Sequence, residues 1–363
     1  MTNLDRRGFL AGSGFATMAL GAGQSWASVG SPSFITAAKE ADGYRLFGLG
    51  SEGDLKFGLR LPDRGHAAAV HPLRTEAVAF ARRPGYFALV LDCARGLIEA
   101  ELTAPLGRHF YGHGCYSADA RHLFTTESAY ESGEGLIGVW DVQAGYRRIG
   151  EISSGGIGPH DVMLMPDGER LVVANGGIRT HPATGREKLN LETMTPNLSY
   201  LRVHDGRLLE TVGPPNYLRR NSIRHLSVSR QGEVAVAFQW QGEADDGVPL
   251  LGFHRQGEST LRIAEADPIE LAAMLGYAGS ISYDGSETRI AISSPRGGRV
   301  MAWDLEGNLL NTWHRTDVCG IAASANGWMA TDGLGGVTML TSELLPTTAS
   351  RYQTAFDNHL IQL

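Results

Sequence analysis

Five histidines occupy equivalent places in a repeated pattern of the sequence and could together bind a transition metal ion. Each lies at or near the start of a segment predicted as a strand, and the five are His66, His113, His160, His225 and His359. Neutral imidazole is the most common nitrogen ligand of zinc, copper, iron and nickel in proteins. Crowded imidazoles also lower one another's pKa, which favours the neutral form that binds metals. One such histidine would more often only cap a strand, but five in equivalent positions favour a shared site.

A second set of polar residues is predicted to surround these histidines, because most of it lies in or beside the loops after the second strand of each repeat. Asp161 and Glu127 are the nearest candidate carboxylates, and Cys319 takes the place of a histidine in the last repeat. The other candidates for ligand contacts at this rim are Asn175, His181, Arg186, Arg224 and Gln239. A site rich in imidazole favours iron or copper, with zinc as the third candidate, over magnesium or calcium.

The elements that would position the histidines belong to a unit that repeats along the chain. Residues 158–177 have the pattern of an apolar strand, a Pro-Asp-Gly turn, a second apolar strand and a glycine-rich break. Variants of this pattern return at residues 65–83, 112–128, 224–241, 279–294 and 318–333. A supersecondary unit that returns every ~40 to 60 residues indicates an array or a propeller.

Each unit continues with two more strands, which are joined by a turn of their own. Most of these turns contain Gly together with Asp or Asn, residues that tolerate the positive φ angles of tight antiparallel hairpins. Four antiparallel strands per unit, repeated radially, make a β-propeller. The predicted blades cover residues 66–105, 108–154, 157–213, 223–265, 276–314 and 317–356.

A seventh blade is predicted to form from the two ends of the chain. Residues 33–62 hold only three strands, and residues 358–363 resemble the inner strand that contains Arg224 and His225. The C-terminal strand would therefore complete the N-terminal blade and close the ring, which removes the free sheet edges. We predict an all-β, seven-bladed propeller that forms a single domain over residues 28–363.

This geometry predicts that the five histidines meet, because every inner strand of a propeller begins at the same rim of the central channel. Two blades lack a histidine there and offer Ala278 or Gly279 and Cys319 or Gly320 instead. The longest loop, at residues 175–197, opens with a glycine pair and contains several basic residues. Since loops of this length in compact domains are often functional, we predict that it is a mobile lid over the channel mouth.

The first 27 residues are predicted to be an export signal. Arg6 and Arg7 form a twin-arginine signature, a weakly apolar run follows, and small residues near position 27 suit cleavage. The apolar run is too short to span a bilayer permanently, so we expect no membrane insertion of the mature chain. The twin-arginine route carries folded proteins, often with a cofactor already loaded, and we therefore expect a periplasmic protein.

Composition narrows the partners and the chemistry. A net charge of −7 with only three lysines provides no basic face for nucleic acid or for an anionic membrane surface. The three cysteines are widely spaced and indicate no disulfide framework. The sequence contains no Walker loop, Gly-x-Ser-x-Gly elbow, His-Glu-x-x-His motif or haem-attachment motif.

Short motifs that span nearly all of the chain after its first 27 residues are shared with a known family. They are residues 81–85, residues 173–178, Thr180-His181-Pro182 with Gly185-Arg186, Arg64-Gly65-His66, Gly112-His113-Gly114, Gly158-Pro159-His160-Asp161 and Ile223-Arg224-His225-Leu226. They resemble exported bacterial seven-bladed propellers known as domain of unknown function 1513. The resemblance implies a propeller, export, and gene neighbours that encode imelysin-like iron-uptake lipoproteins and a di-haem oxidoreductase. It assigns no catalytic activity to the chain. Ala67 departs from the glycine that the family often has there.

Two functions from different classes follow from these observations. The first is a periplasmic metal-binding protein that serves iron or copper acquisition, with the histidines as its site and periplasmic iron-uptake proteins as partners. The second is a non-catalytic scaffold whose rim loops bind a partner protein or a small ligand. A metal-dependent redox enzyme is a third and weaker alternative, so the sequence leaves open whether any reaction is catalysed.

Overall fold

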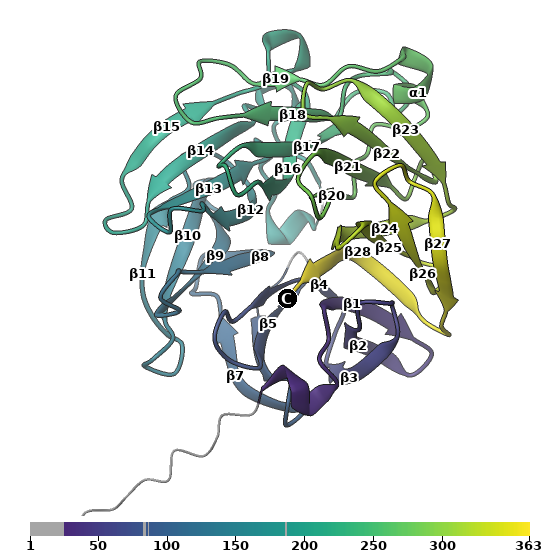
Figure 1. Cartoon of the computed structure of the whole chain (residues 1–363). Coiled ribbons are helices and arrows are strands. Elements are labelled where there is room, and N and C mark those ends of the chain that lie inside the picture. The colour runs from purple at the N-terminus through teal and green to yellow at the C-terminus, as the bar shows by residue number, and fades with distance from the viewer. Residues whose placement is uncertain (1–24, 83–84, 86, 186) are drawn as a thin grey trace, which may run out of the picture.

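The computed structural model describes residues 25–82, 85, 87–185 and 187–363. Strands in this part of the chain form seven four-stranded antiparallel sheets, which are the blades of a β-propeller (Figure 1). The blades surround a common axis, and the C-terminus lies inside the ring. The prediction of an all-β, seven-bladed propeller is therefore confirmed. Of the predicted export signal, residues 1–24 lie outside the described residues.

Six blades follow one another along the chain, and each runs from its innermost to its outermost strand. The first three comprise β4 (Gly65–Val70), β5 (Glu76–Ala81), β6 (Phe87–Asp92) and β7 (Leu97–Thr103); β8 (Arg108–Tyr116), β9 (His122–Ala129), β10 (Glu134–Asp141) and β11 (Arg147–Ser153); and β12 (Pro159–Leu164), β13 (Arg170–Asn175), β14 (Asn197–Arg202) and β15 (Leu208–Val212). The next three comprise β16 (Asn221–Val228), β17 (Val234–Trp240), β18 (Leu251–His254) and β19 (Arg262–Ile263); β20 (Ser280–Tyr283), β21 (Arg289–Ser294), β22 (Arg299–Asp304) and β23 (Leu309–His314); and β24 (Val318–Ser324), β25 (Gly327–Asp332), β26 (Gly336–Thr341) and β27 (Pro346–Arg351).

The seventh blade joins the two ends of the chain, as predicted. Its strands, from the axis outwards, are β28 (Ala355–Gln362), β1 (Phe34–Glu40), β2 (Gly43–Leu49) and β3 (Leu55–Leu61). β28 pairs with β1 in antiparallel register from Phe34 opposite Gln362 to Lys39 opposite Ala355. The Thr36 hydroxyl donates a hydrogen bond of 2.8 Å to the carbonyl oxygen of His359. The last of the described strands in chain order thus closes the ring.

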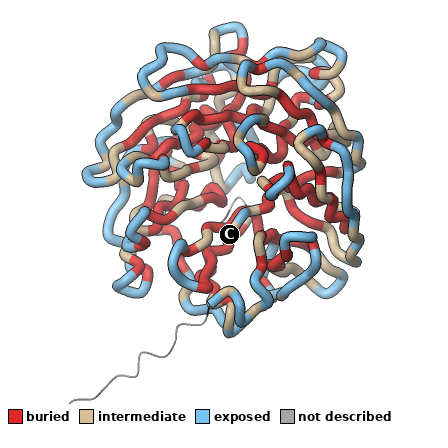
Figure 2. Tube along the Cα trace, in the orientation of Figure 1, coloured by how far each residue is buried: buried red, intermediate tan, exposed pale blue. Residues whose placement is uncertain are grey.

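Burial is greatest in the middle of each blade, because the blades pack face to face around the ring. The middle strands β5 and β25 are buried along their whole length, whereas the outer strands β7 and β11 are mostly exposed. Figure 2 shows the same gradient from buried inner segments to exposed outer loops. Trp328 is fully buried between two blades, and its indole N–H donates a hydrogen bond of 3.0 Å to the carbonyl oxygen of Ser282. The core is therefore a set of layers between blades.

Short helices connect the strands at a few places. They are η1 (Trp26–Val29), η2 (Pro182–Thr184), η3 (Leu191–Thr193), η4 (Asn216–Leu218) and α1 (Pro268–Ala272). α1 begins after Asp267, whose carboxylate accepts a hydrogen bond from the Ile269 N–H at 2.8 Å. Among the described residues, no helix has the length and apolar character needed to cross a membrane.

The inner strands share an irregularity that matters for the site. The register between inner and second strand shifts within β4, β8, β12, β16, β24 and β28, but not within β20. Such bulges insert extra residues into one strand, bend it, and redirect the side chains at that point. Five of the six irregular strands carry one of the predicted histidines, and the sixth carries Cys319 and Gly320.

Candidate metal centre

The structure brings the five predicted histidines together near the axis, each from a different blade. His113 lies at the centre of the group, with its ring centroid 4.6–5.7 Å from those of the other four. His359 lies 4.5 Å from His66 and 4.8 Å from His225, measured between ring centroids. The centroids of His160 and His225 are also 4.8 Å apart. The imidazoles therefore form one contiguous cluster, which we call the histidine layer.

The strand irregularities place these side chains. In β8, the register breaks between Phe110 and Gly114, so that His113 leaves the regular ladder. Gly112 adopts a φ of +100°, and a Cβ built there would lie 2.6 Å from Cδ2 of His66. Only glycine combines this backbone conformation with so close a neighbour. We predicted the histidines at or near strand starts, but in β8, β16 and β28 they lie well inside the strand. Irregularities of register accompany their approach to the axis.

Asp161 orients the central imidazole. Nδ1 of His113 lies 3.2 Å from Oδ1 of Asp161, and Oδ2 accepts a hydrogen bond of 3.1 Å from the Leu226 N–H. Burial alone would raise the pKa of Asp161, but the field of His113 and these hydrogen bonds hold the pKa below its usual value. The ionised carboxylate accepts Nδ1–H and leaves the lone pair of Nε2 available. A histidine held in this way by a carboxylate is the usual arrangement behind a metal ligand.

Four of the histidines have buried ring nitrogens with no hydrogen-bond partner among the described residues. These nitrogens are Nε2 of His113, Nδ1 of His160, both nitrogens of His225 and Nε2 of His359. His113, His225 and His359 are only 3–6% exposed. A buried polar atom left unsatisfied costs about 1–3 kcal/mol, so such atoms normally have an ion, a water or a functional role.

Burial keeps three imidazoles of the layer neutral, those of His160, His225 and His359. Burial, then the neighbouring His113, lowers the pKa of His225 to about 3, although Asp161 acts in the opposite direction. Burial also lowers the pKa of His160 and His359 well below the ordinary value, and neighbouring histidines and arginines add to this effect. Since metals bind the neutral ring, these three side chains need lose no proton at neutral pH.

Two sets of three histidines are compact enough to hold an ion. His66, His113 and His160 form the mouth triad, and His113, His225 and His359 form the channel triad; within each, the donor atoms lie within 4.8 Å of one another. Three nitrogens bound to one ion at about 2.1 Å lie roughly 3.4 Å apart, so binding would draw them closer by on the order of 1 Å. Because Asp161 occupies Nδ1 of His113, the remaining nitrogen can serve only one triad at a time.

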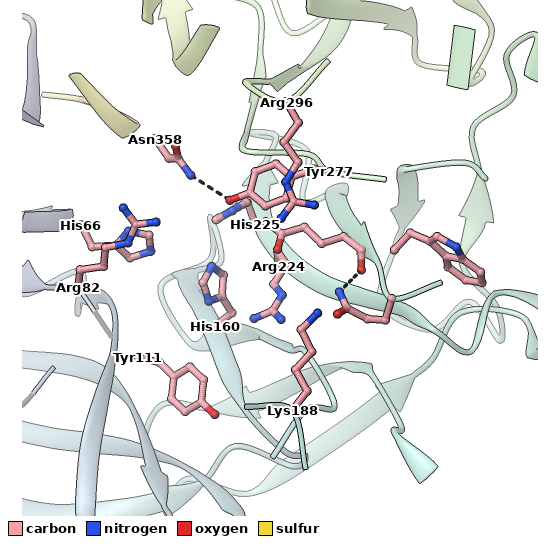
Figure 3. A pocket seen from close by; sticks show the side chains of 13 residues that line it. His66, Arg82, Tyr111, His160, Lys188, Arg224, His225, Tyr277, Arg296 and Asn358 are labelled. Carbon is pink, nitrogen blue, oxygen red and sulfur yellow. Dashed lines mark hydrogen bonds between the residues drawn. The ribbon is translucent and has the colours of Figure 1, made fainter. Parts of the chain in front are cut away.

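A polar cavity of about 280 Å³, the mouth cavity, lies on one side of the histidine layer (Figure 3). Its lining includes His66, His160 and His225, together with four cationic side chains, Arg82, Lys188, Arg224 and Arg296. No Asp or Glu is among the described residues that line it. The Asn358 amide donates a hydrogen bond of 3.2 Å to the Tyr277 hydroxyl, and the Arg296 guanidinium carbon lies 4.3 Å from the centroid of the Tyr277 ring.

A second cavity of about 370 Å³, the channel cavity, lies against the other side of the layer. His113, His225, His359 and Asp161 line it, together with inner-strand residues that are mostly small or apolar, among them Ile281. His225 borders both cavities. The histidine layer therefore separates a cationic mouth from a largely apolar channel.

The predicted rim residues divide into those that reach this region and those that do not. Arg224 and Gln239 line the mouth cavity, and Asp161 contacts His113. Glu127 is not brought to the histidines: it lies on the second strand β9, is fully buried, and pairs with Arg148 Nη2 at 2.9 Å. Burial raises the pKa of Glu127 to about 7.

The remaining predicted rim residues have structural partners elsewhere. The fully buried Asn175 amide is held by Ser154 and Ser199. His181 accepts the Ala183 N–H at 3.1 Å, and its Nε2 lies 3.3 Å from a Glu131 carboxylate oxygen. The Arg186 prediction lies outside the described residues.

Cys319 is also turned away from the histidine layer. Its thiol lies 3.4 Å from the Phe356 carbonyl oxygen and 3.5 Å from that of Thr331, and burial raises its pKa. A buried thiol of raised pKa stays protonated and is a poor metal ligand. Cys319 therefore serves as a small packing residue between β24 and β28.

Several residues of the mouth cavity were not predicted. Arg82, Arg296 and Tyr277 lie just before or after strands, and Asn358 directly precedes His359. Arg82 and Arg296 follow second strands, as Gln239 nearly does, so their place in the repeat is the signal that could have found them. Tyr277 carries no such signal.

The loop at residues 175–197 is held by fixed contacts, where we predicted a mobile lid. Ile178 and Met194 are buried, and the Asn190 side chain bonds the Arg179 N–H at 2.7 Å and the Gly177 carbonyl oxygen at 2.9 Å. Glu192, further along the loop, forms an ion pair with Arg220. The loop is thus a packed strap that brings Lys188 to the mouth cavity.

Comparisons with known proteins agree with the fold. No curated protein matches the chain. A solved structure titled "Kuenenia stuttgartiensis Hydrazine Synthase" is similar with a TM-score of 0.60 and 14% sequence identity, over 85% of this chain and 89% of that chain. At this identity the likeness concerns the fold alone. A family model described as "Protein of unknown function (DUF1513)" matches residues 59–363, and the chain therefore belongs to this family.

Proposed function

We propose that the protein binds one transition metal ion through the mouth triad. The observation that carries this proposal is the set of buried ring nitrogens without partners, centred on a histidine whose other nitrogen is held by Asp161. An ion would satisfy such nitrogens, whereas a cluster that served only for packing would leave them unmatched. The mouth triad is favoured over the channel triad because His66 and His160 line the polar mouth cavity, through which an ion can arrive.

The donor set points to the kind of ion. Imidazole suits iron, copper, nickel and zinc, and the triad contains no thiolate. The buried carboxylate of Asp357 lies 4.0 Å from Nδ1 of His66, beside a second histidine of the triad. Three protein ligands also leave coordination positions open on the ion, as in catalytic zinc sites. The twin-arginine signature and the family resemblance support a role outside the cytoplasm. We propose that this role is the acquisition or handling of iron or copper together with periplasmic iron-uptake proteins.

Elemental analysis of protein exported by its own signal tests the metal site. Purified at neutral pH without chelator, the protein is expected to contain about one equivalent of iron, copper or zinc per chain, because neutral imidazoles bind without proton release. Metal-stripped protein should regain about one equivalent on titration. Protein that is purified from its native host without metal, and that does not take up any of these ions, would contradict the proposal. Ordered water would then be the partner of the buried nitrogens.

Two variants separate the site from adventitious binding. His113→Gln removes the histidine shared by both triads, whereas His314→Gln changes an exposed histidine on β23, outside the layer. We expect the first variant to fold and to lose at least about a hundredfold in metal affinity, since a ligand and its oriented partner are both lost. The second variant should bind like the wild type. Equal binding by both variants would contradict the assignment.

Location can be tested independently of metal. Arg6→Lys combined with Arg7→Lys should keep the protein in the cytoplasm if the twin-arginine signature directs export. Fractionation of cells that express either form would show this. A doubly substituted protein that still reaches the periplasm would contradict the proposed route.

A further inference from the structure

We propose that the mouth cavity binds a small organic anion with at least two carboxylates, and that one carboxylate reaches the metal ion at the histidine layer. The second half of this statement rests on the proposed function, whereas the anion site itself does not. The anion would enter a cavity whose floor holds the metal and whose walls hold positive charge.

The charge of the cavity is unusual for this protein. The whole chain carries a net charge of −7, yet the described lining of the mouth cavity contains four cationic side chains and no carboxylate. The cations come from four different blades: Arg82 follows β5, Lys188 lies between β13 and β14, Arg224 is on β16, and Arg296 follows β21. Positive groups from four blades focus their field on the space between them, which attracts anions.

The partners of these cations show how much of the charge remains for a ligand. Nη1 of Arg82 lies 3.7 Å from the buried carboxylate of Asp357, which partly balances it from behind. Arg296 has no carboxylate within ion-pair distance among the described residues, and its guanidinium rests on the ring of Tyr277. Stacking on an aromatic ring holds a guanidinium in place and leaves its N–H donors free for a carboxylate.

The size and shape of the cavity favour an extended anion over a compact one. A volume of about 280 Å³ is close to the lower limit of small-molecule sites and far exceeds that of one phosphate or chloride. Figure 3 shows Arg296 and Tyr277 on one side of the cavity and Tyr111 and Lys188 on the other, with His160 and Arg224 between them. Carboxylates at the two ends of one molecule could therefore meet cations on both sides.

The position of the histidines adds the link to metal. His66 and His160 belong to the mouth triad and also line the cavity, so an ion bound there has its open coordination positions towards the anion. A carboxylate oxygen is a suitable additional ligand for a borderline metal ion. The class of ligand is accordingly a polycarboxylate of the kind that chelates transition metals.

Calorimetric titration of citrate into the metal-free protein tests the anion site alone. We expect binding that weakens as ionic strength rises, because the attraction is between charges. Arg296→Gln should weaken it about tenfold, and Arg296→Lys should restore only part of the loss, because the charge returns without the planar guanidinium that stacks on Tyr277. The matched control Arg299→Gln removes an arginine of the same blade that pairs with Glu270 at 3.0 Å outside the cavity, and it should bind citrate normally.

Several outcomes would overturn the proposal. If the metal-free protein does not bind citrate, the cavity is not an anion site. If inorganic phosphate binds as tightly as citrate, the ligand is a compact oxyanion and not an extended organic anion. Equal citrate binding by Arg296→Gln and Arg299→Gln would remove the cavity as the place of binding. Since Arg296 is exposed, Arg296→Gln should melt like the wild type. A repeat with loaded metal then tests the contact to the ion: tighter citrate binding supports it, and unchanged binding refutes it without affecting the anion site.

Discussion

The mouth cavity and the channel cavity lie on opposite sides of the same histidine layer and differ in chemistry. The mouth has four cationic side chains, three from loops and Arg224 from the inner strand β16, whereas the channel is lined mostly by small and apolar residues of the inner strands. The difference follows from the elements that form each side. Inner strands crowd around the axis and must fill space, while loops after second strands are free to carry charge. A propeller can therefore carry a chemical site at one end of a channel that is structural at the other.

The largest effect is expected from removal of the strand that borders both cavities. Deletion of residues 357–363 takes Asn358 from the mouth cavity and His359 from the channel cavity, and leaves β1 with an open edge. Lost ladder hydrogen bonds and packing should lower the free energy of unfolding by several kcal/mol. Thermal unfolding would show this as a lower melting temperature. A truncated protein that melts with the wild type would mean that the ring does not depend on β28.

Acid should destabilise the metal-free protein, because it protonates imidazoles of the histidine layer that are neutral in the folded state. Because the pKa of His225 is lowered to about 3 in the folded protein and is about 6.5 in the unfolded chain, only the unfolded chain gains its proton between these values. Stability is therefore complete above about pH 6.5 and falls as pH decreases, by roughly 2 kcal/mol at pH 5 for an imidazole with this shift. Melting temperatures measured from pH 7 to 5 with chelator present would show the decline.

His71 sharpens the interpretation of that experiment. Burial and then Arg74 lower its pKa to about 4, so it contributes a decline of the same sign outside the histidine layer. His225→Gln should therefore make the pH dependence shallower without abolishing it. An unchanged slope in this variant would show that the layer does not contribute.

Variants of two histidines, one from each triad, show which triad holds the ion. His160 belongs to the mouth triad and His359 to the channel triad. If the ion lies on the mouth side, His160→Gln should reduce metal affinity by about a hundredfold and His359→Gln by less than about tenfold, since ligands matter more than neighbours. Metal titrations of both variants would show the ratio. The reverse ratio would move the ion to the channel triad.

A smaller effect is expected from the carboxylate behind the central imidazole. Asp161→Asn keeps the size of the side chain but replaces an ionised acceptor of His113 Nδ1–H by a neutral amide. Loss of such a partner typically reduces metal affinity by about 10–100-fold while the ligands remain. The change should appear in metal affinity with little change in melting temperature. An affinity equal to that of the wild type would mean that Asp161 only shapes the strand pair.

The fold was predictable from the sequence because its signals are local and repeated. Turns with glycine recur at a regular spacing, and the missing inner strand of the first blade matches the C-terminal residues 358–363, as β28 confirms. The meeting of the histidines follows from radial symmetry once the blades are assigned.

The finer arrangement of the site was not predictable, because it depends on departures from the repeat. Bulges accompany the positions of His113, His225 and His359 inside their strands, and no sequence pattern shows where the register of a strand pair shifts. Glu127 was misplaced because the face on which a strand residue lies depends on the register at the strand end. Tyr277 reaches the cavity from an irregular segment, so neither period nor turn chemistry indicated it.

The place of His359 on β28, a strand that comes after the other six blades in the chain, ties the completion of the site to a late stage of synthesis. A ribosome that has made the first six blades still holds the strand that carries this histidine and Asn358, and β1 still lacks its partner. Until β28 has been made and has paired with β1, the two ends of the ring cannot meet and the layer has a gap. A nascent or truncated chain therefore offers metal only part of the cluster. The site is thus complete only in molecules whose chain includes the closure strand β28.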